Sequence, residues 1–171
     1  MILTALTIRG AVASDAEGIH RVEGEAFPDP WSLRMFSHLI EGGSRASARV
    51  MVGCVDERIL GFVVAERADP EIHVTNIAVD PSFRRMGIAQ RLMQAIVSWS
   101  ENEGLEEVWL EVREGNHAAR ALYGALGFVE ILRRPQYYRR PVEDALILAL
   151  FLRGAQALPE RRVAVSLEPC S

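Results

Sequence analysis

Cysteine is scarce in this chain, and the positions of its cysteines exclude two kinds of structure. The sequence holds two cysteines, Cys54 and Cys170, far apart along the chain. It therefore has neither the framework of a disulfide-stapled protein nor the short ligand spacing of a zinc site. Cys54 falls in an apolar strand-like segment, where a free thiol behaves as a small hydrophobic side chain. We expect no metal and a reducing compartment, the cytoplasm.

Basic tracts and long apolar runs are also missing. The net charge is −4, and no cluster of basic residues is long enough for a nucleic-acid footprint. The apolar start Met1–Leu6 lacks the basic region of a signal peptide. The run Ala145–Leu152 has the length of a buried strand and is too short to span a bilayer. We expect neither direct nucleic-acid binding nor membrane contact.

A length of 171 residues predicts a single domain, which we assign to residues 1–153. The remaining residues, 154–171, form a tail of different composition, with prolines, an arginine pair and a short alternating patch, Val163–Leu167. Two alternatives stay open for this tail: disorder, or an added edge strand.

Hydrophobic periodicity predicts the order of strands and helices. Period-two patterns indicate strands at Leu3–Arg9, Arg49–Val55, Ile59–Glu66, Ile72–Val79, Glu107–Arg113, Phe128–Leu132 and Ala145–Leu152. A capping box at Ser14 opens the first predicted helix, Ser32 caps the second, the third covers about Gly87 to Asn102, and Asn116 caps the fourth. The connection between the last two strands carries Tyr137 and Tyr138. This order predicts a mixed α/β sheet with helices on both faces.

The segment from Val79 to Ala89 is the strongest local signal. It contains the pattern R-x-x-G-x-A at Arg84, Gly87 and Ala89, between a strand and a helix. A loop that enters a helix with small residues directs unpaired backbone N–H groups and the positive end of the helix dipole to one place. This arrangement suits a diphosphate, with charge added by Arg84 and Arg85. The plain alternative is a loop arginine pair beside a helix-start glycine, because such a pattern also occurs by chance.

Several longer strings resemble the GCN5-related N-acetyltransferases. They include Asn76-Ile77-Ala78-Val79-Asp80-Pro81, Trp109-Leu110-Glu111-Val112-Arg113, Asn116 through Tyr123, Leu126-Gly127-Phe128 and Phe27 through Ser32. Within that superfamily they look like the ribosomal-protein-alanine N-acetyltransferases of bacteria. The resemblance covers about Ile8 to Leu152. It implies a mostly antiparallel sheet of about seven strands, splayed between the fourth and fifth strands.

The resemblance also implies acetyl-CoA as the acetyl donor, with no metal. It places Arg84, Gly87 and Ala89 at the diphosphate, and the strand before the loop beside the pantetheine. The full set of implied cofactor-binding residues is Ile77, Ala78, Val79, Arg84, Arg85, Met86, Gly87, Ile88, Ala89, Asn116 and Tyr123.

Acetyl transfer to an amine requires removal of a proton from the ammonium and stabilisation of the leaving thiolate. The resemblance assigns the base to Glu111 and the acid to Tyr123. Alternatives for Glu111 are a solvated carboxylate or an ion pair with Arg113 or Arg120. The alternative for Tyr123 is a core aromatic.

Three aromatic residues are candidates for the acceptor groove: Trp31, Tyr137 and Tyr138. The alternative for Trp31 is a residue that packs on a helix, and the alternative for the two tyrosines is an ordinary place as aromatic residues of a strand. His73 is a second candidate for proton relay. Pro135 lies shortly before Tyr137 and Tyr138, and a proline at this place departs from the family pattern.

The function predicted is acetyl-CoA-dependent acetylation of a protein N-terminus, with the N-terminal alanine of a ribosomal protein as acceptor. Two alternatives remain. The acceptor can be a small-molecule amine or a lysine side chain, because loops set acceptor choice. The chain can also be an acetyl-CoA-binding module without turnover.

Overall fold

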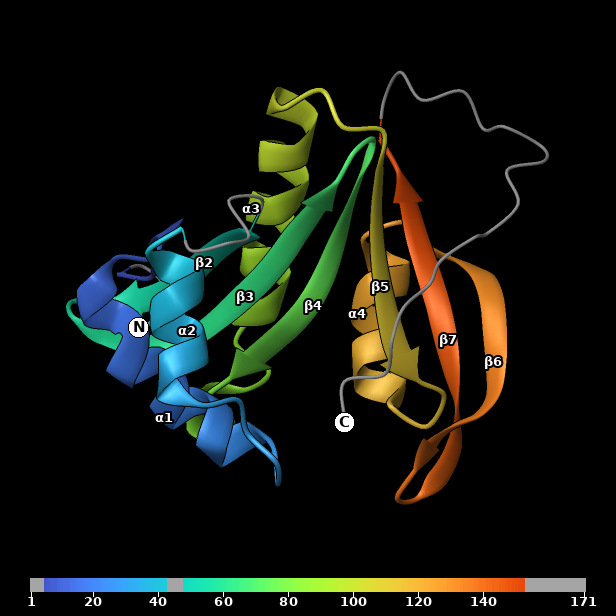
Figure 1. Ribbon diagram of the computed structural model, residues 1–171, viewed down its shortest axis with the longest axis horizontal. Helices are drawn as coiled ribbons and strands as arrows, with labels where there is room; N and C mark the ends of the chain where they lie inside the picture. The colour runs from blue at the N-terminus through green and yellow to red at the C-terminus, as the bar shows by residue number, and fades with distance from the viewer. Residues whose placement is uncertain (1–4, 43–47, 153–171) are drawn as a thin grey trace.

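The computed structural model describes residues 5–42 and 48–152, which form one seven-stranded sheet with helices on both faces (Figure 1). The expectations for the tail 154–171 and for Cys170 lie outside these residues. The strands are β1 (Thr7–Gly10), β2 (Ala48–Val55), β3 (Arg58–Ala68), β4 (Glu71–Val79), β5 (Glu107–Arg113), β6 (Val129–Arg139) and β7 (Val142–Phe151). The helices are α1 (Ala16–Ala26), α2 (Leu33–Ile40), α3 (Ile88–Asn102) and α4 (His117–Ala125), with short 3₁₀ turns η2 (Ala13–Asp15) and η3 (Pro81–Phe83).

The sheet has the order β1-β2-β3-β4-β5-β7-β6. Every neighbouring pair is antiparallel except β4 and β5, which are parallel. The predicted mixed, mostly antiparallel sheet is therefore confirmed. The parallel pair arises because α3 connects β4 to β5, and a crossover helix returns the chain in the same direction.

Helices cover the sheet from two sides and bury two apolar clusters. Leu92, Met93 and Ile96 of α3 are fully buried against one face. The stripe follows the helical repeat, so Leu92→Ala would cost about 2–5 kcal/mol. On the other face, α1 and α2 pack Ile19 and Phe36 over β2 and β3, where Cys54 is also buried, as predicted.

The sheet splays between β4 and β5, as the family resemblance implies. Their pairing ends at Val74 and Leu110, although β4 continues to Val79 and β5 to Arg113. A bulge in the β3–β4 pairing, where Thr75 is the extra residue of β4, lies immediately after this last pair. Bulges bend a strand and increase its twist. The bulge therefore accounts for the divergence of the two strands, which opens downward in Figure 1.

Strand β6 corrects one prediction. It extends through Pro135 to Arg139, so Tyr137 and Tyr138 lie on the strand rather than in a connection. The pairing with β7 shifts between Arg134 and Tyr138, and the N–H of Gln136 donates to Asp144 Oδ1 at 2.9 Å. Pro135 lacks an N–H and is tolerated because it sits in a bulge on an edge strand.

The predicted capping box at Ser14 is wrong. Helix α1 begins at Ala16, after η2, and its N-cap residue is Asp15. The Asp15 carboxylate accepts from the N–H of Val12 at 2.8 Å and from Arg9 at 2.6 Å. A buried carboxylate with a charged partner orders this turn more strongly than a serine hydroxyl.

Among residues 5–42 and 48–152, no helix is long and apolar enough to cross a membrane. The same residues contain no group of three or more potential metal ligands.

Candidate active site

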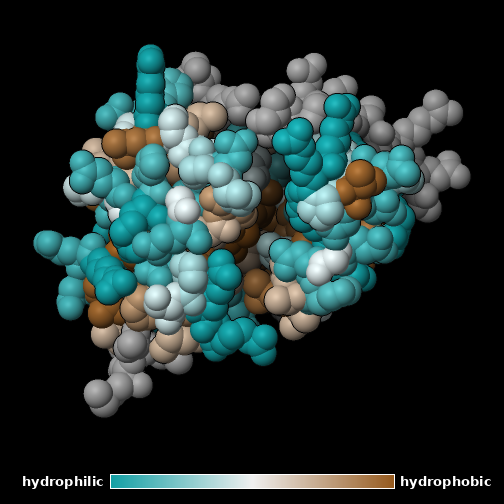
Figure 2. Space-filling model, turned by 90° about the horizontal axis from the view of Figure 1, so that it is seen from below, coloured by the Kyte–Doolittle hydropathy of each residue, from teal (hydrophilic) through white to brown (hydrophobic). Residues whose placement is uncertain are grey.

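The splay of β4 and β5 opens into a cleft of about 950 Å³. From below, hydrophobic residues form the floor of a hollow between two hydrophilic halves of the molecule (Figure 2). The cleft brings together thirteen of the fifteen predicted site residues: Trp31, Ile77, Ala78, Val79, Arg84, Arg85, Gly87, Ile88, Ala89, Glu111, Asn116, Tyr123 and Tyr138. Met86 and Tyr137 are absent from this lining.

One end of the cleft is the N-terminus of α3. Gly87 is the N-cap with a φ of 78°, and a Cβ built there would meet nothing within 4 Å. The helical hydrogen bonds begin with the N–H of Arg91 to the Gly87 carbonyl at 3.1 Å. The N–H groups of residues 87–90 precede this bond and have no acceptor within the helix. These N–H groups point out of the helix end, where the helix dipole adds partial positive charge. A diphosphate can therefore bind there.

Along the cleft wall, β4 offers one free edge. Ile77, Ala78 and Val79 pair with β3 on one side, while β5 has already diverged on the other. Backbone amides and carbonyls on such an edge can pair with an extended ligand that carries amide groups. Pantetheine is such a ligand, so these three residues suit it.

Glu111 lies on β5 between Leu110 and Val112, whose side chains pack into the cluster shared with α3 and α4. Side chains alternate along a strand, so Glu111 faces the opposite side, toward α1 and α2. Its carboxylate Oε1 is 3.2 Å from Nη1 of Arg134 on β6. Both side chains keep about a fifth of their surface exposed, 23% for Glu111 and 21% for Arg134.

The ion pair anticipated for Glu111 exists, but with a partner that the sequence did not suggest. Arg113 instead pairs with Glu143 at 3.3 Å and lies 3.8 Å from the Tyr138 ring centroid. Arg120 donates to the carbonyl of Glu114.

Tyr123 is buried, 5% exposed, yet borders the cleft from the side of α4. Its ring packs on Phe128 with 5.8 Å between centroids. Burial raises the pKa of Tyr123 to about 12. The hydroxyl therefore stays protonated at neutral pH and can act as a hydrogen-bond donor. Tyr123 thus packs in the core and also borders the cleft. Its interpretation as a core aromatic is therefore compatible with a role as a donor at the cleft.

The tyrosine pair stands beside Glu111. Tyr137 and Tyr138 make an edge-to-face contact with centroids 5.3 Å apart. Burial raises the pKa of Tyr138 to about 12, and the negative charge of Glu111 adds to that effect. Burial and Glu111 also raise the pKa of Tyr137. Arg134 lies 5.6 Å from the Tyr137 ring centroid, and Tyr137 is not among the residues that border the cleft.

Glu23 of α1 is a cleft residue that sequence reasoning missed. It is 1% exposed and borders the cleft. Its carboxylate accepts from the N–H of Trp31 at 3.1 Å and from the side-chain amide of Asn76 at 3.1 Å. Burial raises the pKa of Glu23, against the lowering effect of these hydrogen bonds. A glutamate in an amphipathic helix gives no local signal of burial, because the contacts that bury it come from distant segments.

Two further predicted residues are placed clearly. Asn116 is the N-cap of α4, accepts from the N–H of Ala119 at 3.2 Å, and borders the cleft. His73 lies where β4 and β5 are still paired, 3.1 Å from Glu71 and stacked on Trp109. The structure does not bring His73 to the cleft lining.

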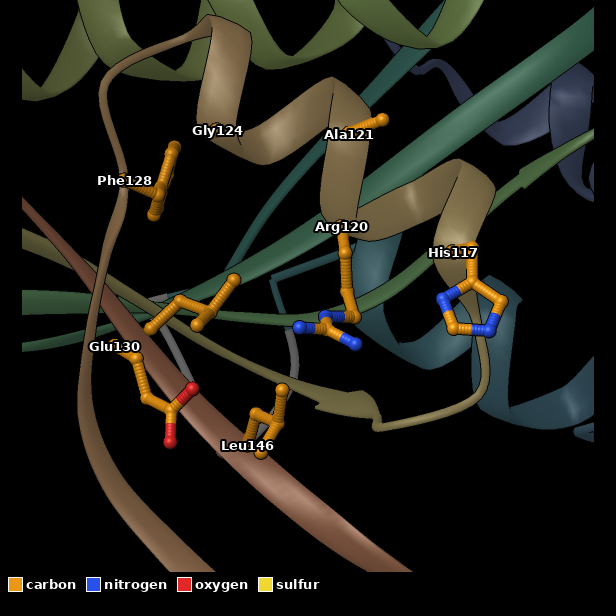
Figure 3. A pocket seen from close by; sticks show the side chains of 8 residues that line it. His117, Arg120, Ala121, Gly124, Phe128, Glu130 and Leu146 are labelled. Atoms are coloured by element: carbon orange, nitrogen blue, oxygen red, sulfur yellow. The ribbon is translucent and has the colours of Figure 1, made fainter.

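A second, smaller cavity of about 380 Å³ lies between α4 and the β6–β7 hairpin. Arg120 of α4 points toward the strands that carry Glu130 and Leu146 (Figure 3). None of the predicted site residues borders this cavity.

Comparison with known proteins agrees with this geometry. A sequence profile of the acetyltransferase (GNAT) family matches residues 16–128. The chain belongs to the GNAT family. It is an N-acetyltransferase, and the fold expected from the sequence is confirmed.

Individual members of the family show similarity along most of the chain. The [ribosomal protein bS18]-alanine N-acetyltransferase of Salmonella typhimurium is 34% identical over 84% of this chain and 96% of its own length. The crystal structure of the ribosomal-protein-S18-alanine N-acetyltransferase from Escherichia coli has a TM-score of 0.78 and 31% identity, covering 92% of this chain and 99% of that one. Arabidopsis thaliana NAA60 in complex with acetyl-CoA shares the fold, with a TM-score of 0.74 and 21% identity over 87% of this chain and 99% of its own.

Proposed function

We propose that this GNAT enzyme transfers the acetyl group of acetyl-CoA to the N-terminal alanine of ribosomal protein bS18, in the cytoplasm. The acceptor is inferred from the bS18-alanine acetyltransferases that resemble the chain at 34% identity over 84% of its length. The observation that carries the proposal is that Glu111 and Tyr123 border one cleft from opposite sides of the splayed sheet.

The donor end of the cleft is assigned to the mouth of α3 and the free edge of β4. The N–H groups of residues 87–90, with Arg84 and Arg85, would hold the diphosphate. Residues 77–79 would pair with the pantetheine, and Asn116 borders the same space. Bound acetyl-CoA supplies an activated acetyl thioester.

The acceptor end is assigned to the side of the sheet that faces α1 and α2. Trp31 and Tyr138 border the cleft there, together with the carboxylates of Glu23 and Glu111 and the guanidinium of Arg113. A protein N-terminus is cationic before reaction, so these carboxylates are the groups that would hold its ammonium.

Two residues of the chain move or hold protons in this mechanism. Glu111 accepts a proton from the acceptor ammonium, which frees the nitrogen lone pair for attack. Tyr123 holds its proton at Oη and donates a hydrogen bond to the departing sulfur. With a pKa of about 12, against about 8.5 for a thiol, complete proton transfer from Tyr123 is uphill, so hydrogen bonding is its main contribution.

The test is thiol release with acetyl-CoA and a matched panel of amines. The panel contains a peptide with the bS18 N-terminus, the same peptide with a blocked N-terminus, a blocked peptide with one internal lysine, and a polyamine. We expect turnover of the free N-terminal peptide alone, with the acetyl group located on its first residue by mass spectrometry.

Each other outcome has a distinct meaning. Turnover of the lysine peptide or the polyamine in place of the free N-terminus would replace the proposed acceptor. Acetyl-CoA binding without thiol release from any amine would indicate a binding module. The sequence contains no lysine, so an acetyl-lysine signal in this assay cannot come from the enzyme itself.

A further inference from the structure

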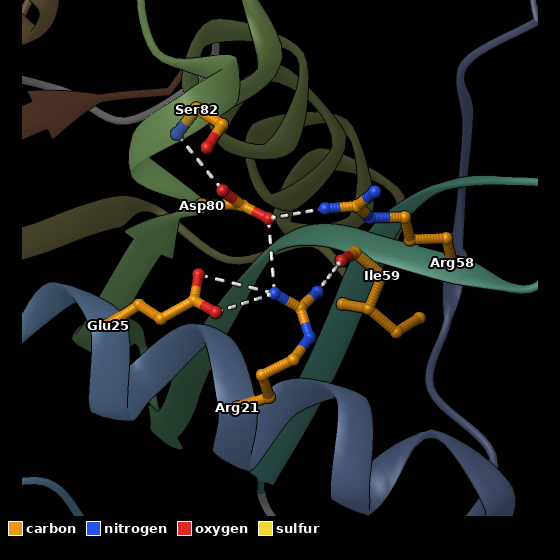
Figure 4. Close-up of polar contacts among 6 residues, drawn as sticks. All are labelled: Arg21, Glu25, Arg58, Ile59, Asp80 and Ser82. Atoms are coloured by element: carbon orange, nitrogen blue, oxygen red, sulfur yellow. Dashed lines mark hydrogen bonds and ion pairs between the residues drawn. The ribbon is translucent and has the colours of Figure 1, made fainter.

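Asp80 is a buried carboxylate just outside the cleft. It lies between the end of β4 and η3, and it is 1% exposed. Its Oδ1 accepts from the N–H of Ser82 at 3.0 Å. Its Oδ2 is 3.1 Å from Nη1 of Arg21 and 3.3 Å from Nη2 of Arg58 (Figure 4). The sequence motif that begins at Val79 contains this residue, but the chemistry assigned to the motif does not use it.

The two arginines connect Asp80 to other elements. Arg21 extends from α1 and also donates to the carbonyl of Ile59 on β3 at 2.7 Å. Arg58 of β3 lies 4.9 Å from the ring centroid of Phe83, which borders the cleft. Burial acts to raise the pKa of Asp80, but the Ser82 N–H and the two guanidinium groups outweigh it and hold the pKa below its usual value. Asp80 therefore joins α1, β3 and the loop as a charged centre.

The loop between Asp80 and α3 needs such a connection. No residue of η3 is fully buried, and within the loop only Phe83 and Met86 pack, in part, against the core. Side-chain packing therefore holds the loop at two points and leaves its other residues to be fixed by polar contacts. Arg85 has a φ of 64° and Gly87 a φ of 78°. The left-handed region is unfavourable for a residue such as arginine, so the surrounding structure must hold it there.

We propose that Asp80, through Arg21 and Arg58, is a positioning residue that fixes loop 81–87 in the conformation that presents the α3 N–H groups to the diphosphate. This inference rests on the proposed function, because it takes the mouth of α3 as the diphosphate site. Asp80 does not itself contact the donor. Its contribution is the direction of the N–H groups and of Arg84 and Arg85.

The test compares Asp80→Asn with Asp15→Asn. Asp15 is the matched control, because it is also buried, pairs with Arg9 and accepts a backbone N–H at a 3₁₀ turn, but that turn leads into α1 and not into the loop before α3. By calorimetry, Asp80→Asn should weaken acetyl-CoA binding about tenfold or more, the effect expected for charge-assisted hydrogen bonds. Asp15→Asn should keep the affinity within about twofold of the original.

A second donor separates positioning from general damage. S-acetylpantetheine lacks the diphosphate, so Asp80→Asn should leave kcat/KM for this donor unchanged while it lowers kcat/KM for acetyl-CoA. Arg58 is 60% exposed, so Arg58→Gln should fold even if Asp80→Asn does not. It should weaken acetyl-CoA binding in the same direction, about threefold, as expected for a partly exposed pair.

Two results would overturn the inference while the proposed function stands: unchanged acetyl-CoA affinity in both Asp80→Asn and Arg58→Gln, or an equal loss with both donors. Failure of the unsubstituted enzyme to bind acetyl-CoA would instead overturn the proposed function, and this inference with it.

Discussion

Arg134 of β6 and Glu111 of β5 form an ion pair across the intervening strand β7, with 3.2 Å between Nη1 and Oε1. The carboxylate proposed as the base thus already has a cationic partner before an acceptor arrives. An acceptor ammonium must share or replace that partner. Arg134 therefore opposes acceptor binding at the same time as it orders the Glu111 side chain.

Replacement of Arg134 by glutamine should lower the KM for a cationic N-terminal peptide. We expect a decrease of up to about fivefold, because the pair is partly exposed and worth about 0.2–1 kcal/mol. Initial rates at varied peptide concentration measure it. Arg133→Gln is the control, since its neighbouring guanidinium pairs with Glu114, Glu130 and Asp144 instead. A raised KM in Arg134→Gln would mean that the arginine holds the acceptor.

Glu111→Gln tests the base directly. We expect kcat to fall about 10²-fold at neutral pH, the usual contribution of a general base, while acetyl-CoA affinity stays unchanged. The deficit should shrink as the pH approaches 10, because free amine then accumulates without the enzyme. The control is Glu114→Gln, which removes a nearby exposed carboxylate outside the cleft lining. A deficit that stayed constant from pH 7 to pH 10 would make Glu111 a residue that only orients the acceptor.

Gly87→Glu tests the diphosphate site, and the same helix supplies its control. Gly87 and Gly104 flank α3, with φ values of 78° and 70°, and each has open space where a Cβ would be. Glutamate at either position should strain the backbone by a similar amount, about 1–2 kcal/mol. Only Gly87→Glu places a negative charge at the helix mouth, so it alone should weaken acetyl-CoA binding, by at least about tenfold. Equal acetyl-CoA affinities of Gly87→Glu and Gly104→Glu, measured by calorimetry, would show that the diphosphate does not bind at the N-terminus of α3.

The features that sequence predicted best are those encoded within a few residues. The R-x-x-G-x-A pattern contains the left-handed glycine and the helix start that it needs, and Asn116 carries its own capping oxygen. The mixed sheet also followed from the order of elements along the chain, since a helix between β4 and β5 favours a parallel pair.

The features that sequence missed depend on contacts between distant segments. The partner of Glu111 depends on the register of three strands, and that register is shifted by the bulge at Pro135. Periodicity stopped β6 at Leu132 because an edge strand with exposed, charged residues lacks clear alternation. The buried carboxylates of Glu23 and Asp80 could not be distinguished from surface residues, because Trp31, Asn76 and Arg58 reach them from other elements.

Glu23→Gln should change how stability depends on pH. Burial raises the pKa of Glu23 above its ordinary 4.5, so the folded protein binds a proton more tightly than the unfolded chain. The free energy of unfolding therefore decreases as the pH rises from about 4.5 through the raised value. Glutamine removes this titration, so the variant should gain stability relative to the original protein across that window. Urea unfolding at pH 4.5 and pH 7.5 measures the difference. A constant difference would show that Glu23 titrates normally.

Tyr123→Phe keeps the ring against Phe128 and removes only the hydroxyl. If that hydroxyl stabilises the departing thiolate, kcat should fall while the peptide KM and acetyl-CoA affinity stay near their original values. The decrease in kcat should be about tenfold, which is smaller than the decrease expected for Glu111→Gln. The reason is that a pKa of about 12 limits Tyr123 to hydrogen bonding, worth about 1.4 kcal/mol.

Stability provides an independent check on the same variant. Because the folded pKa of Tyr123 lies near 12 and the ordinary value is 10.0, the hydroxyl contributes stability that is present below pH 10 and lost as the pH rises from 10 toward 12. The phenylalanine variant lacks this loss, so it should be relatively more stable at pH 11 than at pH 7, as measured by urea unfolding. If kcat were unaltered while this shift in stability appeared, Tyr123 would be a core residue, and water would have to stabilise the leaving group.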